Sequence, residues 1–284
     1  FKGREEMDYL ELLPKFAINF STGAGDLYAT VTRGYKAGGF NTQIFSDILQ
    51  EKTKNSLMAD AMSAMGRPSA PSEDGDASIT TYDPEYSWNY EVGGHLEFAD
   101  KRLRWDFAAF WIECRDQQLT VFPDGLTTGR MMSNAGRSRS KGFETTLEWR
   151  RRDAHRGLSV VGNYGYTHAK FVEFNDGVND YAGNYLPYAP QHTASLSASY
   201  RFDVGGGFLR HIDLDASWQG AGKIYWNEAN TLEQDFYSQL SASVTLHTRN
   251  VSLSLWGRNL TDTDFYTFYF KSMTNNFYNH GKPC

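Results

Sequence analysis

The sequence predicts an all-β fold, an antiparallel transmembrane β-barrel to which this chain contributes about ten strands. Three observations predict it. Apolar and polar side chains alternate with a period of two along many segments, as they do in strands. Short and long connections alternate along the chain. Aromatic residues (17 Tyr, 19 Phe and 7 Trp in 284 residues) gather toward the ends of the apolar sides, where a membrane barrel places its aromatic girdles.

The alternation is clearest in the stretch ASLSASYRF, residues 194–202. The mean hydropathy of −0.56 is polar, yet it fits a membrane barrel because only every second residue of each strand faces lipid. The same pattern, clean or partial, predicts strands over 14–21, 26–35, 85–98, 102–118, 143–150, 157–169, 194–202, 208–219, 240–247 and 251–270.

The connections indicate which kind of β protein this is. Short ones lie near 22–25, 99–102, 151–157, 203–207 and 248–250. Long ones occupy about 36–84, 119–139, 170–191 and 221–235. Outer-membrane barrels sort their connections in this way, with short periplasmic turns at one end and long extracellular loops at the other. A soluble carbohydrate-binding β-sandwich, whose core also concentrates aromatic side chains, is the less favoured alternative.

The first long connection contains a predicted helix. Between residues 45 and 65, apolar side chains recur at three- and four-residue spacing, and Ser46 is a suitable N-cap. The sequence therefore predicts a short helix in this loop. The helix would either pack on the base of its own loop or form part of a lid over a binding cavity.

Composition and motifs argue against several functions. A formal charge of −6 argues against a nucleic-acid partner. The chain contains only two cysteines, Cys114 and Cys284, and no GxSxG, HExxH, P-loop or dinucleotide-binding motif. We therefore expect no enzyme activity, no catalytic residues, no cofactor and no metal site. Residues 175–180 include possible oxygen ligands for calcium but lack EF-hand spacing, so a calcium site there stays open.

Five segments together resemble the barrel of TonB-dependent outer-membrane receptors. They are RGYKAGGFN, YDPEYSWNYEVGGHLEF, NAGRSRSKGFETTLEW, YLPYAPQHTASLSASY and LWGRNLTDTDFY, in this order along nearly the whole chain. The stretch CRDQQLTVFPDGLTTGRMMSNAGR is most similar to iron-complex receptors of Bacteroidetes-type bacteria. Each segment alone is weakly specific, whereas the five in sequence are quite specific.

The resemblance implies an organisation and a function. Such receptors have an N-terminal plug domain inside a barrel of about twenty-two strands. Residues 1–284 would then be a C-terminal portion of the barrel, with the plug and the first half of the barrel absent and the final strand truncated. The implied function is uptake of a scarce ligand, most concretely a ferric siderophore, across the bacterial outer membrane. TonB would energise it through the plug, and outer-membrane lipid would surround the barrel. A passive porin-like channel is the alternative.

The candidate ligand contacts lie at the rim and in the predicted external loops. RGYKAGGFN would place basic and aromatic side chains where a strand rises past the lipid. The loops carry aromatic side chains that suit stacking on a siderophore, a cobamide or a sugar, although ordinary loop packing explains them about as well. The predicted set is Arg33, Tyr35, Lys36, Tyr181, Tyr185, Tyr188, Tyr225 and Trp226.

Overall fold

The computed structural model of the chain describes residues 6–42, 57, 81–121, 131–134, 136–152, 156–176, 179–272 and 275–281. The elements with assigned bounds in this part of the chain are all β-strands. Within the same residues, no helix is long and apolar enough to cross a membrane. The short helix predicted in the 45–65 loop lies outside the described residues, apart from Leu57.

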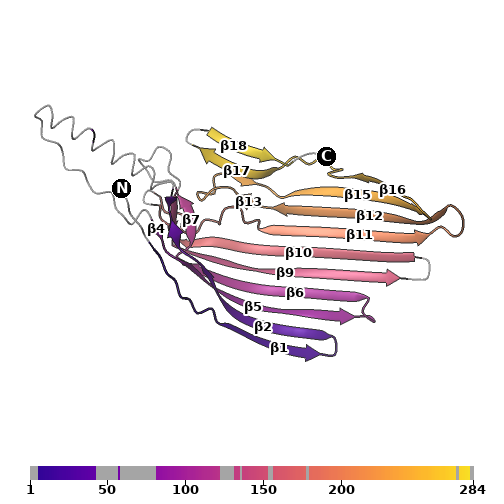
Figure 1. Cartoon of the computed structure of the whole chain (residues 1–284), viewed down its shortest axis with the longest axis horizontal. Helices are drawn as coiled ribbons and strands as arrows, with labels where there is room; N and C mark the ends of the chain where they lie inside the picture. The colour runs from indigo at the N-terminus through magenta and orange to yellow at the C-terminus, as the bar shows by residue number, and fades with distance from the viewer. Residues whose placement is uncertain are drawn as a thin grey trace, which may run out of the picture.

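Ten strands form one antiparallel sheet in which sequence neighbours are also spatial neighbours (Figure 1). The order is β1-β2-β5-β6-β9-β10-β11-β12-β15-β16, which confirms the prediction of about ten strands. Their bounds are β1 Lys15–Thr22, β2 Gly25–Lys36, β5 Glu85–Phe98, β6 Leu103–Arg115, β9 Arg137–Arg152, β10 Arg156–Glu173, β11 His192–Asp203, β12 Leu209–Gly222, β15 Tyr237–Thr248 and β16 Ser252–Gly257.

The two ends of the sheet differ as the loop lengths predict. The strand ends that the five short connections join all lie at one end of the sheet, on the right in Figure 1, and we call it the short-turn end. The opposite end, here the long-loop end, carries the long connections. Four small two-stranded sheets lie in these connections and after β16. Their strands are β3 Gly39–Phe40 with β4 Thr81–Tyr82, β7 Gln118–Val121 with β8 Met131–Asn134, β13 Ile224–Tyr225 with β14 Glu233–Gln234, and β17 Tyr266–Ser272 with β18 Asn275–His280.

One predicted strand is broken. The segment 251–270 does not form a single strand: β16 ends at Gly257 and β17 begins at Tyr266. Asn259 and Asp262 have φ of 47° and 49° between them, which no regular strand accommodates. The Asn259 side chain accepts a hydrogen bond from the Thr263 amide and donates one to the Thr263 carbonyl, both at 3.0 Å. These bonds close a turn that a period-two pattern cannot reveal.

The register gives the sheet two chemically distinct faces. Leu196 pairs with Trp218, which pairs with Leu240, and this row belongs to the apolar face. One residue along, Ser197 pairs with Ser217 on the opposite face, here the polar face. Leu196 is 51% exposed although it is apolar. A large apolar surface left in contact with solvent is unfavourable in water and is expected of a surface that faces lipid.

The buried side chains of the described residues lie mostly at the long-loop end. One cluster contains Phe171 and Phe174, and a second contains Ile224, Trp226 and Tyr269. Phe171 belongs to the polar face, because its partner in β9 is Ser138. The polar face is therefore covered by loops at this end.

The described sheet is open. β1 pairs with β2 alone and β16 with β15 alone among the strands of this sheet. All eight residues of β1 are exposed. Both outermost strands thus present unpaired backbone groups, which are not tolerated facing hydrocarbon. The described strands therefore leave the sheet unclosed.

Candidate ligand-binding site

Two long connections are docked on each other at the long-loop end. The Tyr188 amide donates to the Tyr225 carbonyl at 2.8 Å, and the Gln191 amide donates to the Lys223 carbonyl at 3.0 Å. The loop after β10 thus pairs with the loop after β12 beyond the end of the sheet. The two loops form one unit, and we call it the docked loops (residues 174–191 and 223–236).

Asparagine side chains join the same two loops. Asn230 accepts from the Tyr185 amide at 2.6 Å and donates to the Tyr185 carbonyl at 2.9 Å. Asn184 donates to the Glu228 carbonyl at 2.9 Å. Asn230 adopts φ of 55°, a conformation that asparagine tolerates better than most residues. The loops are therefore fixed by specific hydrogen bonds and not by apolar packing alone.

Tyr185 and Tyr225 stack across the docked loops, with ring centroids 5.3 Å apart and planes at 15°. The Lys170 ammonium lies 4.4 Å from the Tyr185 ring centre, and that of Lys223 lies 5.3 Å from the Tyr225 ring centre. A hydrogen bond to Glu233 raises the pKa of Lys223. The four side chains form one stack, in which each ammonium group makes a cation–π contact with a tyrosine ring in addition to the contact between the rings.

This stack lies on the apolar face. Lys170 bridges to Tyr185, and paired residues of an antiparallel bridge share a face. Lys170 has the same strand parity as Tyr166, which pairs with Phe143 on the apolar face. Tyr185 and, through the stacking, Tyr225 therefore point outward from the sheet.

Tyr181, Tyr188 and Trp226 have different surroundings. The Tyr181 hydroxyl donates to Asp176 at 2.9 Å, and its ring packs on the cluster that contains Phe171. Burial raises the pKa of Tyr181, and the bond to Asp176 adds to the shift. Trp226 is 6% exposed in the second cluster, and its indole N–H has no hydrogen-bond partner among the described residues. These residues lie on the covered, polar-face side.

Tyr188 lies where the docked loops meet β17. Its hydroxyl donates to the Tyr269 carbonyl at 2.7 Å. Its ring contacts Trp226 edge-on at 5.5 Å and stacks on Phe268 at 5.9 Å. The side chain is still 49% exposed. Tyr188 therefore combines a fixed ring with a surface open to a ligand.

Arg33 and Tyr35 lie at the rim on the apolar face. Arg33 donates to the Leu12 carbonyl at 3.0 Å, pairs with Glu11 at 3.3 Å and lies 4.8 Å from the Tyr86 ring centre. The Tyr35 hydroxyl is buried without a hydrogen-bond partner among the described residues. The polar partners of Arg33 belong to the chain itself, and the Tyr35 hydroxyl has none among the described residues. Neither side chain therefore lies in an open ligand site.

Lys36, the third residue of this group, points the other way. It follows Tyr35 directly in β2, so its side chain lies on the polar face. The side chain is exposed. The strands β5, β6 and β9 separate β2 from β10 in the sheet. The structure thus brings Tyr185, Tyr188, Tyr225 and Trp226 together and leaves Arg33, Tyr35 and Lys36 apart from them.

The sequence did not single out Lys170, Asn184 or Asn230, which organise the docked loops. Asn230 has a detectable signal, because asparagine is favoured in turns and at positive φ. Lys170 is the residue after Ala169 at the end of a long alternating strand, and its face follows from counting residues. The partners of Asn184 and Asn230 lie 44 and 45 residues away, so the sequence does not reveal the contacts themselves.

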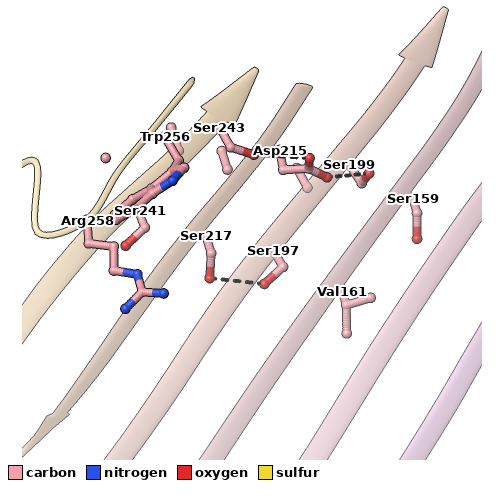
Figure 2. A pocket seen from close by; sticks show the side chains of 14 residues that line it. Ser159, Val161, Ser197, Ser199, Asp215, Ser217, Ser241, Ser243, Trp256 and Arg258 are labelled. Carbon is pink, nitrogen blue, oxygen red and sulfur yellow. Dashed lines mark hydrogen bonds between the residues drawn. The ribbon is translucent and has the colours of Figure 1, made fainter. Parts of the chain in front are cut away.

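A cavity of about 470 Å³ lies on the polar face of β10, β11, β12, β15 and β16. In Figure 2, Asp215 lies between Ser199 and Ser243 and accepts a hydrogen bond from each, at 2.7 Å and 3.2 Å. Six of the lining residues are serines. Because serine is small and polar, this part of the sheet forms a shallow wall that carries hydroxyl groups among small apolar side chains. Such a wall suits the polar interior of a barrel.

The carboxylates of the acidic segment 175–180 accept hydrogen bonds from their own loop. Asp176 accepts from the Asn179 amide at 2.7 Å and from the Tyr181 hydroxyl. Asp180 accepts from the Ala182 amide at 2.9 Å. These contacts satisfy carboxylate oxygens with donors of the loop itself. Residues 177 and 178 lie outside the described part of the chain.

The comparison with protein families decides the identity of the fold. The family model for the TonB dependent receptor-like β-barrel matches residues 3–260. The chain belongs to this family. The resemblance and the barrel prediction are therefore confirmed, and the soluble sandwich is excluded. Members of the TonB-dependent receptor family are transport receptors of the bacterial outer membrane, and the outer membrane is where this chain belongs.

Individual TonB-dependent receptors agree with this assignment. The metal-pseudopaline receptor CntO of Pseudomonas aeruginosa is 27% identical over 212 residues, which is 73% of this chain and 28% of that protein. The ferric yersiniabactin uptake receptor FyuA from Yersinia pestis has a TM-score of 0.67 at 22% identity, over 95% of this chain and 35% of that one. The siderophore receptor PiuA from Acinetobacter baumannii has a TM-score of 0.65 at 21% identity, over 95% and 34%. The chain thus spans about a third or less of the receptors it matches.

Proposed function

We propose that this chain is part of the barrel of an active-transport receptor that imports a ferric siderophore or a similar scarce metal chelate. The docked loops carry this proposal. They fix a half-exposed tyrosine, Tyr188, beside the covered polar face at the long-loop end. A rigid site with aromatic surface and polar groups is what recognition of a chelate requires. The relatives named for metal-pseudopaline and ferric yersiniabactin support the choice of a metal chelate.

The rest of the receptor is proposed to come from outside residues 1–284. In this proposal the chain is a C-terminal portion of the barrel, and a plug domain fills the interior and contacts TonB. The open sheet supports this, since β1 and β16 each lack a second neighbour in the described sheet. The serine-lined cavity on the polar face supplies a wall for a plug or for a passing ligand. Outer-membrane lipid covers the apolar face. In this proposal the receptor acts as a transporter and not as an enzyme.

The predicted contact residues are proposed to fall into two groups. Lys36, Tyr181 and Tyr188 contact the ligand, because they lie on the polar face or beside it. Trp226 supports Tyr188 from beneath, since it is buried against it. Arg33, Tyr35, Tyr185 and Tyr225 stiffen the outer rim on the apolar face. The two groups make a matched pair for experiment.

The test uses the full-length protein in detergent and a panel of ferric catecholate, hydroxamate and carboxylate siderophores. The triple variant K36A/Y181A/Y188A should bind its chelate more than tenfold more weakly, because one aromatic contact contributes about 0.5–1.5 kcal/mol. The control R33A/Y35A/Y225A should change affinity less than about threefold, a shift under about 1 kcal/mol. Uptake of radioactive iron should require TonB. Equal weakening in both variants would contradict the division by face, and TonB-independent uptake would favour the passive channel.

A further inference from the structure

Two histidines and an aspartate converge at the short-turn end, far along the sheet from the docked loops. His211 in β12 pairs directly with His247 in β15. Asp213 follows two residues after His211, so its side chain shares the polar face with both imidazoles. One potential ligand atom from each residue lies within 4.8 Å of the other two. Strand register brings this cluster together, and it needs no loop.

The cluster offers candidate ligand atoms that already have supporting partners. The rings of His211 and His247 stack with centroids 4.2 Å apart. His247 Nε2 lies 3.1 Å from an Asp213 oxygen, and its Nδ1 lies 2.8 Å from the Ser252 hydroxyl. A metal-bound histidine typically donates its second ring N–H to an oxygen partner, which fixes the ring. The Ser252 hydroxyl is placed to accept that hydrogen bond when Nε2 binds a metal.

One positive charge opposes a cation in this position. Arg201 donates two hydrogen bonds to Asp213, at 2.6 Å and 2.7 Å. Asp203, which pairs with His211 in the register, and Asp215, two residues after Asp213, add negative charge near the guanidinium. The guanidinium therefore competes with a metal ion for the Asp213 carboxylate. Substituting Arg201 therefore tests the site, because the substitution removes the competing charge.

We propose that His211, His247 and Asp213 bind one divalent transition-metal ion, of the zinc, nickel or copper class, and thereby cross-link β12 to β15. Imidazole nitrogen suits these ions better than magnesium or calcium. Four-coordinate zinc at about 2.0–2.1 Å from each ligand requires the three atoms to approach to about 3.4 Å. The imidazoles can do so by rotating about their side-chain bonds, because both are only partly buried. Water completes the coordination. The proposal does not depend on the nature of the transported chelate.

The sheet contains a natural comparison for this site. His95 and Asp106 in β5 and β6 also pair across strands, with 2.6 Å between His95 Nδ1 and the carboxylate. Arg104 donates to Asp106 at 2.9 Å. The second imidazole is replaced there by Tyr28, whose ring stacks on His95 at 5.7 Å. This trio has the same carboxylate and the same arginine competitor but one nitrogen ligand fewer, so it should bind metal weakly.

The experiment measures Zn²⁺ and Co²⁺ binding to the full-length protein, purified in detergent with a histidine-free tag and stripped with chelator. Wild-type protein should bind one equivalent of metal ion. His211→Ala and His247→Ala should each lower the affinity for that ion by more than about 100-fold, since the loss of a residue that only supports a ligand typically lowers it about 10–100-fold. His95→Ala should leave that equivalent unchanged. Arg201→Gln should tighten it severalfold, because the competing charge is gone. Co²⁺ should show the visible absorption of a four-coordinate nitrogen and oxygen site.

A second measurement needs no variant. Zn²⁺ should slow the modification of His211 and His247 by diethyl pyrocarbonate in wild-type protein, read by mass spectrometry, and should leave His95 unaffected. The proposal is overturned if Zn²⁺ protects neither histidine. It is equally overturned if the doubly substituted His211→Ala/His247→Ala protein, shown to be folded by heat-modifiable gel migration, retains the equivalent. In either case the two rings are only a stacked pair beside an ion pair.

Discussion

The short-turn end and the long-loop end of the sheet are built from the same ten strands, yet they are stabilised differently. At the short-turn end the strands close in tight turns such as Thr22 to Gly25, where Gly25 adopts φ of 140° and an added Cβ would collide with the His95 carbonyl oxygen. At the long-loop end, small sheets and two clusters of buried side chains cover the polar face. The short-turn end combines ladder hydrogen bonds with side-chain pairs such as Arg201 with Asp213, whereas the long-loop end adds a packed interior.

This difference separates two tasks along each strand. In the middle of each strand, apolar and polar side chains alternate, so this part forms a wall with one face toward lipid and the other toward water. The long-loop end holds specific side chains in fixed positions by asparagine hydrogen bonds and aromatic packing, as a binding site requires. The short-turn end carries the polar-face cluster around His211 instead. Substitutions at these places should therefore have effects of different size and kind.

The largest effect is expected from a charge on the apolar face. Leu196→Arg would place a guanidinium against lipid near the middle of β11, at a cost of about 2–4 kcal/mol near the membrane midplane. Ser197→Arg is the matched control on the polar face, where Ser197 bonds to Ser217 at 3.3 Å. Chemical unfolding of the full-length protein in lipid vesicles should show a large loss of stability for the first variant only. Similar losses for both would mean that the faces are not distinct.

A smaller effect is expected where the loops dock. Asn230→Ala removes both side-chain hydrogen bonds to the Tyr185 backbone and leaves a residue that disfavours φ of 55°. Undocking should become easier by about 2 kcal/mol, since each net hydrogen bond contributes about 1 kcal/mol. Amide exchange at Tyr185 and Tyr188 reports it directly. Asn230→Gly tolerates the backbone conformation, so its loss should be smaller and should isolate the hydrogen bonds. Unchanged exchange in both variants would show that the loops are held by packing alone.

The smallest effect concerns pH. Burial raises the pKa of Glu228, in the loop beyond β12. The docked loops therefore hold this proton more tightly than free loops do. Docking is most stable below the ordinary glutamate pKa of about 4.3 and weakens as pH rises through the raised value. Glu228→Gln should abolish this dependence and strengthen docking near neutral pH by less than about 1 kcal/mol, as is usual outside a core. Amide exchange at Asn184, measured at acidic and at neutral pH, reports the pH dependence and the strengthening of docking. If the ratio of the exchange rates at the two pH values were the same in the wild-type protein and in the variant, the prediction would be wrong.

Much of the fold follows from the sequence, because side-chain alternation and loop length are local properties. The same counting places Arg33 and Tyr35 on the face of Val31 and Lys36 on the other, although the prediction treated the three as one group. The docking of Tyr185 on Tyr225 could not be predicted, since it depends on hydrogen bonds between distant loops. The His211 cluster was missed because its two histidines are 36 positions apart and meet only through the β12–β15 register.

The alternation itself can be measured directly along β11. Spin labels at single cysteines replacing Ser195, Leu196, Ser197 and Ala198, in the full-length protein lacking its native cysteines and reconstituted in bilayers, report contact with oxygen in lipid or with a water-soluble nickel reagent. Oxygen should relax the labels at 196 and 198 more strongly than those at 195 and 197. The nickel reagent should relax the labels at 195 and 197 more strongly than those at 196 and 198. A profile without this period, or with the opposite phase, would contradict a membrane wall whose apolar face meets lipid.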